Sequence, residues 1–176
     1  MARIFQVPTI SGIPKTMKFY EASEYQECNN RLFEVYRAKI ISLLPTARIE
    51  HIGSSSVPGA ISKGDLDIFV GVEPVELENA VLKLEEIGFF VKLDTLRTSE
   101  LCMLESNEPN VALQVVANKS KYEFFITFRN ALINSPELLS SYNSLKKNST
   151  FFSEEDYRKV KSDFISRALK DNCRQS

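Results

Sequence analysis

The sequence predicts an α+β fold with α/β-like features, in which helices flank a small mixed β-sheet and the C-terminal third is helical. Apolar residues recur at helical spacing over residues 21–44, and short strand-like apolar runs occupy residues 47–117. Helical spacing then returns from residue 121. The length of 176 residues suits a single domain. We expect an N-terminal arm at about 1–16, an α/β core at 17–120 and C-terminal helices at 121–170.

The elements of the core follow in order along the chain. Residues 2–20 are expected to form an irregular arm with one short strand, because prolines and a glycine interrupt the apolar residues. The first helix covers 21–44 and ends at Pro45. The second helix begins at Pro74 and runs to Ile87, where Gly88 stops it. The predicted strands are 47–52, 65–72, 89–93, 100–106 and 111–117.

The C-terminal third contains three predicted helices, at 122–133, 136–147 and 153–170. Pro136 marks the start of the second. Ser153, with Asp156 three residues later, approximates a capping box for the third. The phenylalanine-rich run "FFITF" at 124–128 is expected to pack in the core rather than to stack on bases.

Composition favours a soluble protein of the cytoplasm. The formal net charge of −1 gives no overall basic field for nucleic acid or an anionic membrane. No apolar run approaches the ~20 residues that a membrane span needs, and the N-terminus does not resemble a secretory signal. The cysteines Cys28, Cys102 and Cys173 lack metal-binding spacing, so we expect free thiols, with Cys28 and Cys102 as small core residues.

Asp65 and Asp67 are the first candidate site residues. Side chains at i and i+2 on a strand share a face, so these carboxylates lie side by side while Leu66, Ile68 and Val70 point into the core. Adjacent carboxylates repel each other unless a cation lies between them, and hard oxygen ligands suit Mg²⁺. The structural alternative is turn chemistry at a strand start.

A glycine-serine stretch precedes the aspartate pair by ten residues. Gly53 lets the backbone approach a phosphate closely, and backbone N–H groups with the hydroxyls of Ser54 and Ser55 can cradle phosphate oxygens. A serine-rich connector with Pro58 and Gly59 is the structural alternative. The ordered combination of strand, Gly-Ser and Asp-apolar-Asp is more specific than either part alone.

The motif "HIGSSS…GDLDIFV" resembles the signature of the DNA polymerase beta-like nucleotidyltransferase superfamily. More narrowly, "IEHIGSSSVPGAISKGDLDIFVGV" is similar to the "EHIGSTAVPG" segment of the GrpB family. Further on, "LQVVANKSKYEFFITFRNALINSPELLSSYNSLKK" and "DYRKVKSDFI" resemble that family's later strand and helices. The resemblance covers roughly residues 17–170 and implies a nucleotidyltransferase fold.

The resemblance also implies the chemistry of the site. Gly53 and Ser54, with Ser55 and Lys63, would contact the nucleotide, and Asp65 and Asp67 would be the catalytic residues that hold Mg²⁺ or Mn²⁺. GrpB-like sequences often carry only the second acid, so the full pair here favours a working metal site.

The third carboxylate of such sites is expected on the strand "VALQVV", where Gln114 stands instead. An amide can bind a metal but cannot take a proton from an attacking hydroxyl. Asp94 or Glu105 could approach from adjacent strands. The GrpB family often carries a histidine near this point, and this chain does not.

Six residues are candidates for the wall of the site. His51, the single histidine, could orient the glycine-serine loop, contact substrate, or simply bond to backbone. Arg129 either points at the site or pairs with an acid. Lys161 shares a helical face with Tyr157 four residues earlier. Each has the alternative of a structural or solvated position, and the full set is His51, Gln114, Arg129, Lys146, Tyr157 and Lys161.

These observations favour a GrpB-like protein that binds a nucleoside triphosphate, with ATP the expected one, and transfers a nucleotidyl group to an unidentified acceptor. A small-molecule or protein acceptor fits the net charge of −1 better than long nucleic acid. The alternative is a non-catalytic nucleotide- or metabolite-binding module on the same fold. A purely structural interaction domain is the third hypothesis. The base, the acceptor and the oligomeric state stay open.

Overall fold

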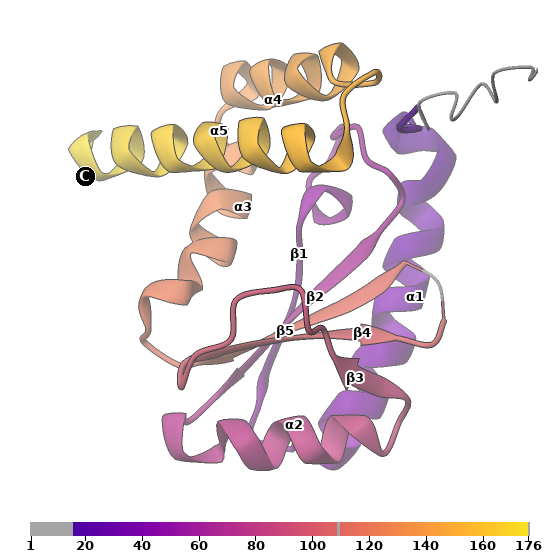
Figure 1. Cartoon of the computed structure of the whole chain (residues 1–176), viewed down its shortest axis with the longest axis vertical. Coiled ribbons are helices and arrows are strands. Elements are labelled where there is room, and N and C mark those ends of the chain that lie inside the picture. The colour runs from indigo at the N-terminus through magenta and orange to yellow at the C-terminus, as the bar shows by residue number, and fades with distance from the viewer. Residues whose placement is uncertain (1–15, 109, 176) are drawn as a thin grey trace, which may run out of the picture.

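Five strands form a single mixed sheet in the computed structural model, which describes residues 16–108 and 110–175, with side chains through residue 170. The strand order is β1-β2-β5-β4-β3 (Figure 1). The central strands β2 and β5 are parallel, whereas the other neighbouring pairs are antiparallel. The bounds are β1 Arg48–Ile52, β2 Leu66–Val72, β3 Phe89–Val91, β4 Leu101–Ser106 and β5 Val111–Ala117.

The helices fall into two groups. α1 Ala22–Leu43 and α2 Leu77–Glu85 cover one face of the sheet. After β5 the chain passes through a short 3₁₀ turn, Lys121–Glu123, into α3, which leads away from the other face to α4 and α5 (Figure 1). The bounds of this second group are α3 Phe124–Asn134, α4 Pro136–Asn148 and α5 Glu154–Gln175. The α+β architecture with a helical C-terminal third, predicted from periodicity, is confirmed.

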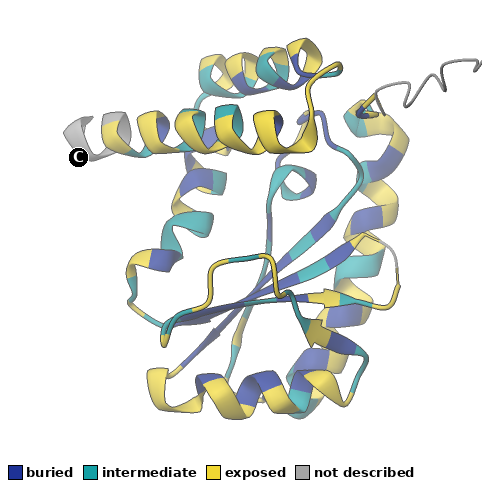
Figure 2. Ribbon diagram, viewed as in Figure 1, coloured by how far each residue is buried: buried dark blue, intermediate teal, exposed yellow. Residues whose placement is uncertain are grey.

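The core has parts on both faces of the sheet. Ile68 of β2 and Val115 of β5 pack with residues such as Ile40 and Leu84 against α1 and α2. On the other face, Phe69 and Val116 belong to a smaller cluster. Figure 2 shows the consequence, with largely buried strands and helices that expose one side.

A third apolar cluster ties the glycine-serine loop to the C-terminal helices. Val57 and Ala60 of the loop are fully buried, and they pack with Phe128 of α3, Tyr142 of α4 and Ala168 of α5. Burying these side chains removes apolar surface from water and stabilises the contact. The loop is therefore held between the sheet and the helical third.

The structure differs from the sequence predictions in a few places. Cys102 is buried as predicted, but the prediction for Cys28 is wrong, because Cys28 lies on the exposed side of α1. The segment after Pro74 starts as a 3₁₀ turn, Pro74–Glu76, before α2. β3 stops at Val91, and Leu93 beyond it is 94% exposed. The predictions for the arm at 1–15 and for Cys173 lie outside the residues whose side chains are described. Within residues 16–108 and 110–175, no helix combines the length and the apolar character needed to cross a membrane.

Candidate active site

The aspartate pair lies at the start of the central strand β2. Asp65 directly precedes the strand, and Asp67 is its second residue, paired with Ile52 of β1 and with Ala112 of β5. Leu66 and Ile68 are fully buried, whereas both aspartates are partly exposed and line the same two cavities. The predicted alternation of apolar and acidic side chains along this strand is confirmed.

Gly53 lies directly against Asp67. Its backbone has a positive φ of 71°, a conformation that glycine adopts without strain. A Cβ atom built on Gly53 would lie 2.4 Å from Oδ2 of Asp67. A side chain at position 53 would therefore displace the carboxylate, and the absence of one lets the loop backbone approach the acid.

The front of the loop, meaning the side that faces the aspartates, is fixed by Lys146 of α4. The Nζ of Lys146 donates a hydrogen bond to Oγ of Ser54 over 2.7 Å and another to the backbone oxygen of Ile61. It therefore joins both ends of the loop. Burial, and then the charge of Lys161, lower the pKa of Lys146 to about 6. Its hydrogen-bond partners are neutral oxygens, so they do not offset the effect of burial on the charged amine.

The back of the loop, meaning the side away from the aspartates, is fixed by His51. Its Nε2 lies 2.9 Å from Oγ of Ser55, and its ring stacks on Phe33 at a centroid distance of 5.0 Å. Burial first, and then the charge of Arg129, lower the pKa of His51 to about 4, so the imidazole is neutral at pH 7. Ser55 is completely buried, so the expectation that its side chain contacts nucleotide is corrected.

Arg129 of α3 also lies behind the loop. Its guanidinium donates to the backbone oxygen of His51 over 2.8 Å and forms an ion pair with Glu50 over 2.7 Å. It lines none of the cavities described below, so the expectation that it forms part of the site wall is corrected. The sequence left two roles open for Arg129, and the structure shows the second, an ion pair with an acid.

The smaller of the two cavities has a volume of about 210 Å³, and we call it the cationic cavity. It lies between the loop, the aspartates, α4 and α5. Its basic residues outnumber its acidic ones, since four basic side chains line it together with the two aspartates. The lining residues are Ser54, Ser62, Lys63, Asp65, Asp67, Lys146, Tyr157, Arg158 and Lys161.

The electrostatics of the cationic cavity keep Lys161 charged. Tyr142 raises the pKa of Lys161 against the opposing effect of burial, and Tyr157, Asp67 and Asp65 raise it further. Burial raises the pKa of Tyr157, so this phenol stays neutral. Lys63 lies over the Tyr157 ring, with its Nζ 5.2 Å from the centroid. The cavity therefore offers fixed positive charge next to the acid pair.

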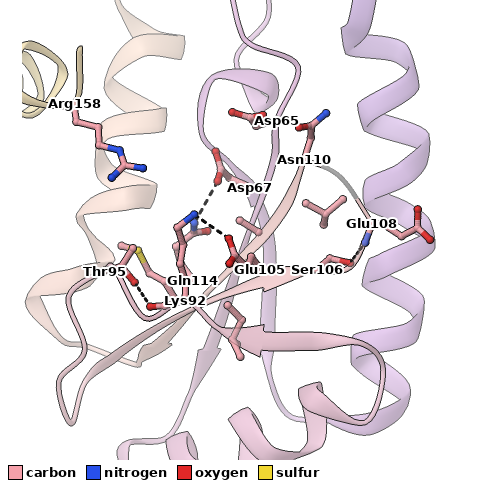
Figure 3. Close-up of a pocket in the computed structure, with 14 residues that line it drawn as sticks. Asp65, Asp67, Lys92, Thr95, Glu105, Ser106, Glu108, Asn110, Gln114 and Arg158 are labelled. Atoms are coloured by element: carbon pink, nitrogen blue, oxygen red, sulfur yellow. Dashed lines mark hydrogen bonds and ion pairs between the residues drawn. The ribbon is translucent and has the colours of Figure 1, made fainter. Parts of the chain in front are cut away.

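The larger cavity, about 430 Å³ in volume, lies on the other side of the aspartates, above β4 and β5 (Figure 3). Ala112 of β5 pairs with Asp67 of β2 on one side and with Glu105 of β4 on the other. Its small side chain therefore leaves room between the two acids. Lys92 forms an ion pair with Glu105 over 2.9 Å. Hydroxyl and amide groups from Thr95, Ser106, Asn110 and Gln114 supply much of the remaining lining.

Gln114 occupies the position at which an acid was expected. Its Nε2 donates to Oδ1 of Asp67 over 3.3 Å, while its Oε1 is buried and has no hydrogen-bond partner among the described residues. Burial is the largest influence on Asp67 and raises the pKa of that carboxyl, with a further contribution from Asp65. An unsatisfied amide oxygen beside two carboxylates fits a hard cation that supplies the missing partner.

No cluster of three or more His, Cys, Asp or Glu side chains suited to a metal ion occurs among the described residues. Asp94 approaches the site only indirectly, through an ion pair with Arg158 over 3.6 Å. Glu105 lines the larger cavity but is paired with Lys92. A divalent ion held here would bind two carboxylates and complete its shell with other oxygens, a mode that Mg²⁺ commonly uses.

The structure brings most of the predicted residues together and adds two that the sequence reasoning missed. Ser54, Lys63, Asp65, Asp67, Lys146, Tyr157 and Lys161 all line the cationic cavity. Gln114 lines the larger cavity, and Gly53 touches Asp67. The missed residues are Arg158 and Lys92. Arg158 lies three residues before Lys161, so helical spacing carried a signal, whereas Lys92 had none in the sequence pattern.

The chain has clear relatives. It matches the family model described as GrpB protein over residues 21–171. It is 56% identical over 154 residues to a UPF0157 protein of Vibrio cholerae, covering 87% of this chain and 82% of that protein. It is 28% identical over 140 residues to a UPF0157 protein of Deinococcus radiodurans, covering 78% and 73% respectively.

The fold has a solved counterpart. The crystal structure of the conserved protein GrpB from Enterococcus faecalis superposes with a TM-score of 0.69, at 23% sequence identity. The match covers 88% of this chain and 99% of that one. The shared fold is nucleotidyltransferase-like. The family model spans nearly the whole described chain and agrees with this fold, so the chain belongs to the GrpB family.

Proposed function

We propose that this protein is a nucleotidyltransferase of the cytoplasm that binds a nucleoside triphosphate, with ATP the expected one, together with Mg²⁺ or Mn²⁺. It transfers the nucleotidyl group to a small-molecule or protein acceptor. The observation that carries the proposal is the aspartate pair at the junction of two cavities of different chemistry. One cavity is rich in cations and suits phosphates, and the other is lined by hydroxyl, amide and ion-paired groups and suits an acceptor.

The divalent ion would be held by Asp65 and Asp67, with the orphaned Oε1 of Gln114 as a further oxygen ligand. When bound, it stabilises negative charge on the reacting phosphate. Lys63, Lys146 and Lys161 bind the outer phosphates and hold the chain of phosphates in one orientation. Ser54 contributes its hydroxyl at the same wall.

The transfer forms a bond between the acceptor oxygen and the α-phosphorus and breaks the bond from that phosphorus to the bridging oxygen of the β-phosphate. Pyrophosphate leaves, and lysines of the cationic cavity balance its charge. The acceptor loses its proton to solvent, because the amide of Gln114 cannot accept it and Glu105 is paired with Lys92. We therefore expect slow turnover without a dedicated base.

The lining of the larger cavity supports a small polar acceptor or a protein hydroxyl. None of its described lining residues is aromatic, so it offers no platform for stacking the bases of a nucleic acid. Its volume of about 430 Å³ lies in the ordinary range of small-molecule sites.

Gln114 favours a second candidate function, a nucleotide-binding module without catalysis. The two functions share the triphosphate and metal site and differ only in the chemical step. Pyrophosphate release with a panel of hydroxyl-bearing acceptors separates them.

Thermal melting with ATP, GTP, CTP and UTP, each with and without Mg²⁺, tests the shared binding site. A nucleotide at about a hundred times its dissociation constant should stabilise the native state by about 2.7 kcal/mol. For a chain of this size that is a rise in Tm of about 5 to 10 °C. Asp67→Asn should abolish the Mg²⁺-dependent part, while Asp163→Asn, an exposed acid outside both cavities, should keep it.

The variant Asp67→Asn has a second expected effect, on stability, that needs no ligand. The folded-state pKa of Asp67 is raised, so the folded protein loses stability as pH rises through the interval above the ordinary pKa of the acid. Asparagine cannot ionise, so Asp67→Asn without ligand should melt higher than the unsubstituted protein at pH 7. If no nucleotide at millimolar concentration shifts the Tm, the proposed function is wrong.

A further inference from the structure

A third cavity, about 330 Å³ in volume, lies between the start of α3 and one face of α5. Phe124 and Phe125 line it from α3, and Ile165 and Leu169 line it from α5. The exposed residues Ser162 and Ser166 add hydroxyl groups. We call this the aromatic cavity, and its walls are mostly apolar.

The whole "FFITF" run at 124–128 was expected to pack in the core, but the structure places only part of it there. Phe128 is buried against Tyr142 and Ala168 in the core cluster of the helical third. Phe124 and Phe125 are only half-buried, and their rings stack on each other with centroids 4.3 Å apart. Two aromatic rings at the wall of a cavity offer a surface on which a flat ring can pack.

The aromatic cavity adjoins the candidate active site at two basic side chains that line both. Arg158 and Lys161 line both the aromatic cavity and the cationic cavity. Arg158 also lines the larger cavity, so all three cavities adjoin this side chain. On α5 the residues 158, 161, 162, 165, 166 and 169 form one stripe at helical spacing, cationic near the aspartates and apolar further along.

A ligand that matches this arrangement has an anionic chain joined to a flat, largely apolar ring with polar edges. The anionic part of such a ligand would lie beside Lys161 and Arg158, next to the aspartates, and the ring would lie against the two phenylalanines. The larger cavity cannot take the ring in the same way, since its described lining contains no aromatic residue. A nucleoside phosphate has this combination of charge and shape.

We infer that the aromatic cavity binds the base of the nucleotide whose phosphates occupy the cationic cavity. This inference rests on the proposed function. Phe124 and Phe125 pack against the base, and the hydroxyls of Ser162 and Ser166 hydrogen-bond its polar edge. The larger cavity is thereby left free for the acceptor on the opposite side of the aspartates.

Titration calorimetry with Mg²⁺–ATP and with Mg²⁺–tripolyphosphate tests the inference, because the two probes share the phosphate chain and differ in the nucleoside. Stacking on aromatic side chains contributes about 1 to 3 kcal/mol per base, so ATP should bind about 5-fold to 150-fold more tightly. Ser166→Leu fills part of the aromatic cavity from an exposed position, away from the basic residues and without adding an aromatic ring, and should remove this preference. The matched variant Ser140→Leu is exposed on α4 and lines none of the three cavities, so it should retain the preference.

Each outcome has one meaning. A preference for ATP that is lost only in Ser166→Leu supports the aromatic cavity as the base site. Equal affinity for the two probes in the unsubstituted protein overturns the inference but leaves the phosphate site intact. A preference that survives Ser166→Leu also overturns it, because the base then binds elsewhere. If neither probe binds, the proposed function itself fails.

Discussion

The front and the back of the glycine-serine loop differ in whether their ionisable side chains have partners of opposite charge. At the back, Arg129 pairs with Glu50 over 2.7 Å, and His51 is neutral and bonded to Ser55. At the front, Lys146 is buried with only neutral oxygens as hydrogen-bond partners, and burial raises the pKa of Asp67.

This difference assigns the two sides different roles: the back stabilises the loop, and the front binds the ligand. The charges at the back are satisfied within the protein, so they stabilise the loop without any ligand. The ionisable groups at the front, Lys146 and Asp67, are desolvated, so burial disfavours their charged forms unless a ligand compensates them. Changes at the back should therefore lower stability, whereas changes at the front should alter ligand binding more than stability.

The largest effect on stability is expected from Arg129→Met. The substitution leaves Glu50 without its closest partner and the backbone oxygen of His51 without a donor, in a region where both charged side chains are mostly buried. Breaking such a pair should cost about 2 to 3 kcal/mol, which is a fall in Tm of about 5 to 10 °C. Thermal melting measures it.

The control for this prediction is Arg31→Met, which removes an exposed helical ion pair with Glu27 and should change stability by less than about 0.5 kcal/mol. The rise in Tm that Mg²⁺–nucleotide produces should be retained in Arg129→Met. If Mg²⁺–nucleotide no longer raises the Tm of Arg129→Met, the back of the loop also contributes to binding, and the proposed division between the two sides is wrong.

The sequence predicted the front of the loop better than the back. The aspartate pair, Gly53 and Ser54 were found because period-2 alternation fixes which side chains share a face and because a glycine-serine turn has a recognisable chemistry. The loop's buried side could not be found in that way. Ser55 follows Ser54 directly, and only the 3₁₀ turn Ser54–Ser56 determines that one faces the cavity while the other is buried.

Tertiary packing explains the other differences. Arg129 has its partners, Glu50 and His51, about eighty residues earlier in the chain, so local patterns cannot reveal the pairing. Lys92 reaches the larger cavity only because β3 pairs with β4 and brings it to Glu105. The division of the "FFITF" run between core and cavity depends on how α5 crosses α3, which helical periodicity alone does not determine.

A smaller effect, about 2 kcal/mol, is expected from the titration of His51. Its folded-state pKa of about 4 lies below the ordinary value of 6.5, so the unfolded chain binds the proton more tightly. The stabilising contribution is complete above pH 6.5 and is lost as pH falls from 6.5 toward 4. His51→Gln should lack this part of the acid destabilisation in urea unfolding measured at pH 7 and at pH 4.5.

The same prediction has a direct spectroscopic check. His51 is the single histidine of the chain, so its imidazole signal in proton NMR titrates without overlap from other histidines. The midpoint should lie near pH 4. A midpoint near 6.5 would mean that the ring is exposed, and the back of the loop would then not be the buried support described above.

Among the substitutions at the loop, the smallest effect on stability, about 1 kcal/mol or less at pH 7, is expected from Lys146→Met. The substitution removes a desolvated amine but leaves Ser54 and the oxygen of Ile61 without their donor, and these terms oppose each other. Its larger consequence concerns binding. The folded-state pKa of Lys146 is about 6, so at pH 7 to 8 the amine is mostly neutral in the free protein.

A bound phosphate chain favours the protonated amine, so binding takes up a proton and weakens as pH rises above 6. Calorimetry with Mg²⁺–tripolyphosphate between pH 6 and pH 8 measures this trend. The slope of log Kd against pH should be smaller in Lys146→Met by up to one unit, while Lys147→Met, the exposed neighbour outside the cationic cavity, should keep the full slope. Equal slopes in all three proteins would mean that phosphate does not reach Lys146. The buried amine would then only fasten the loop, and the front would be as structural as the back.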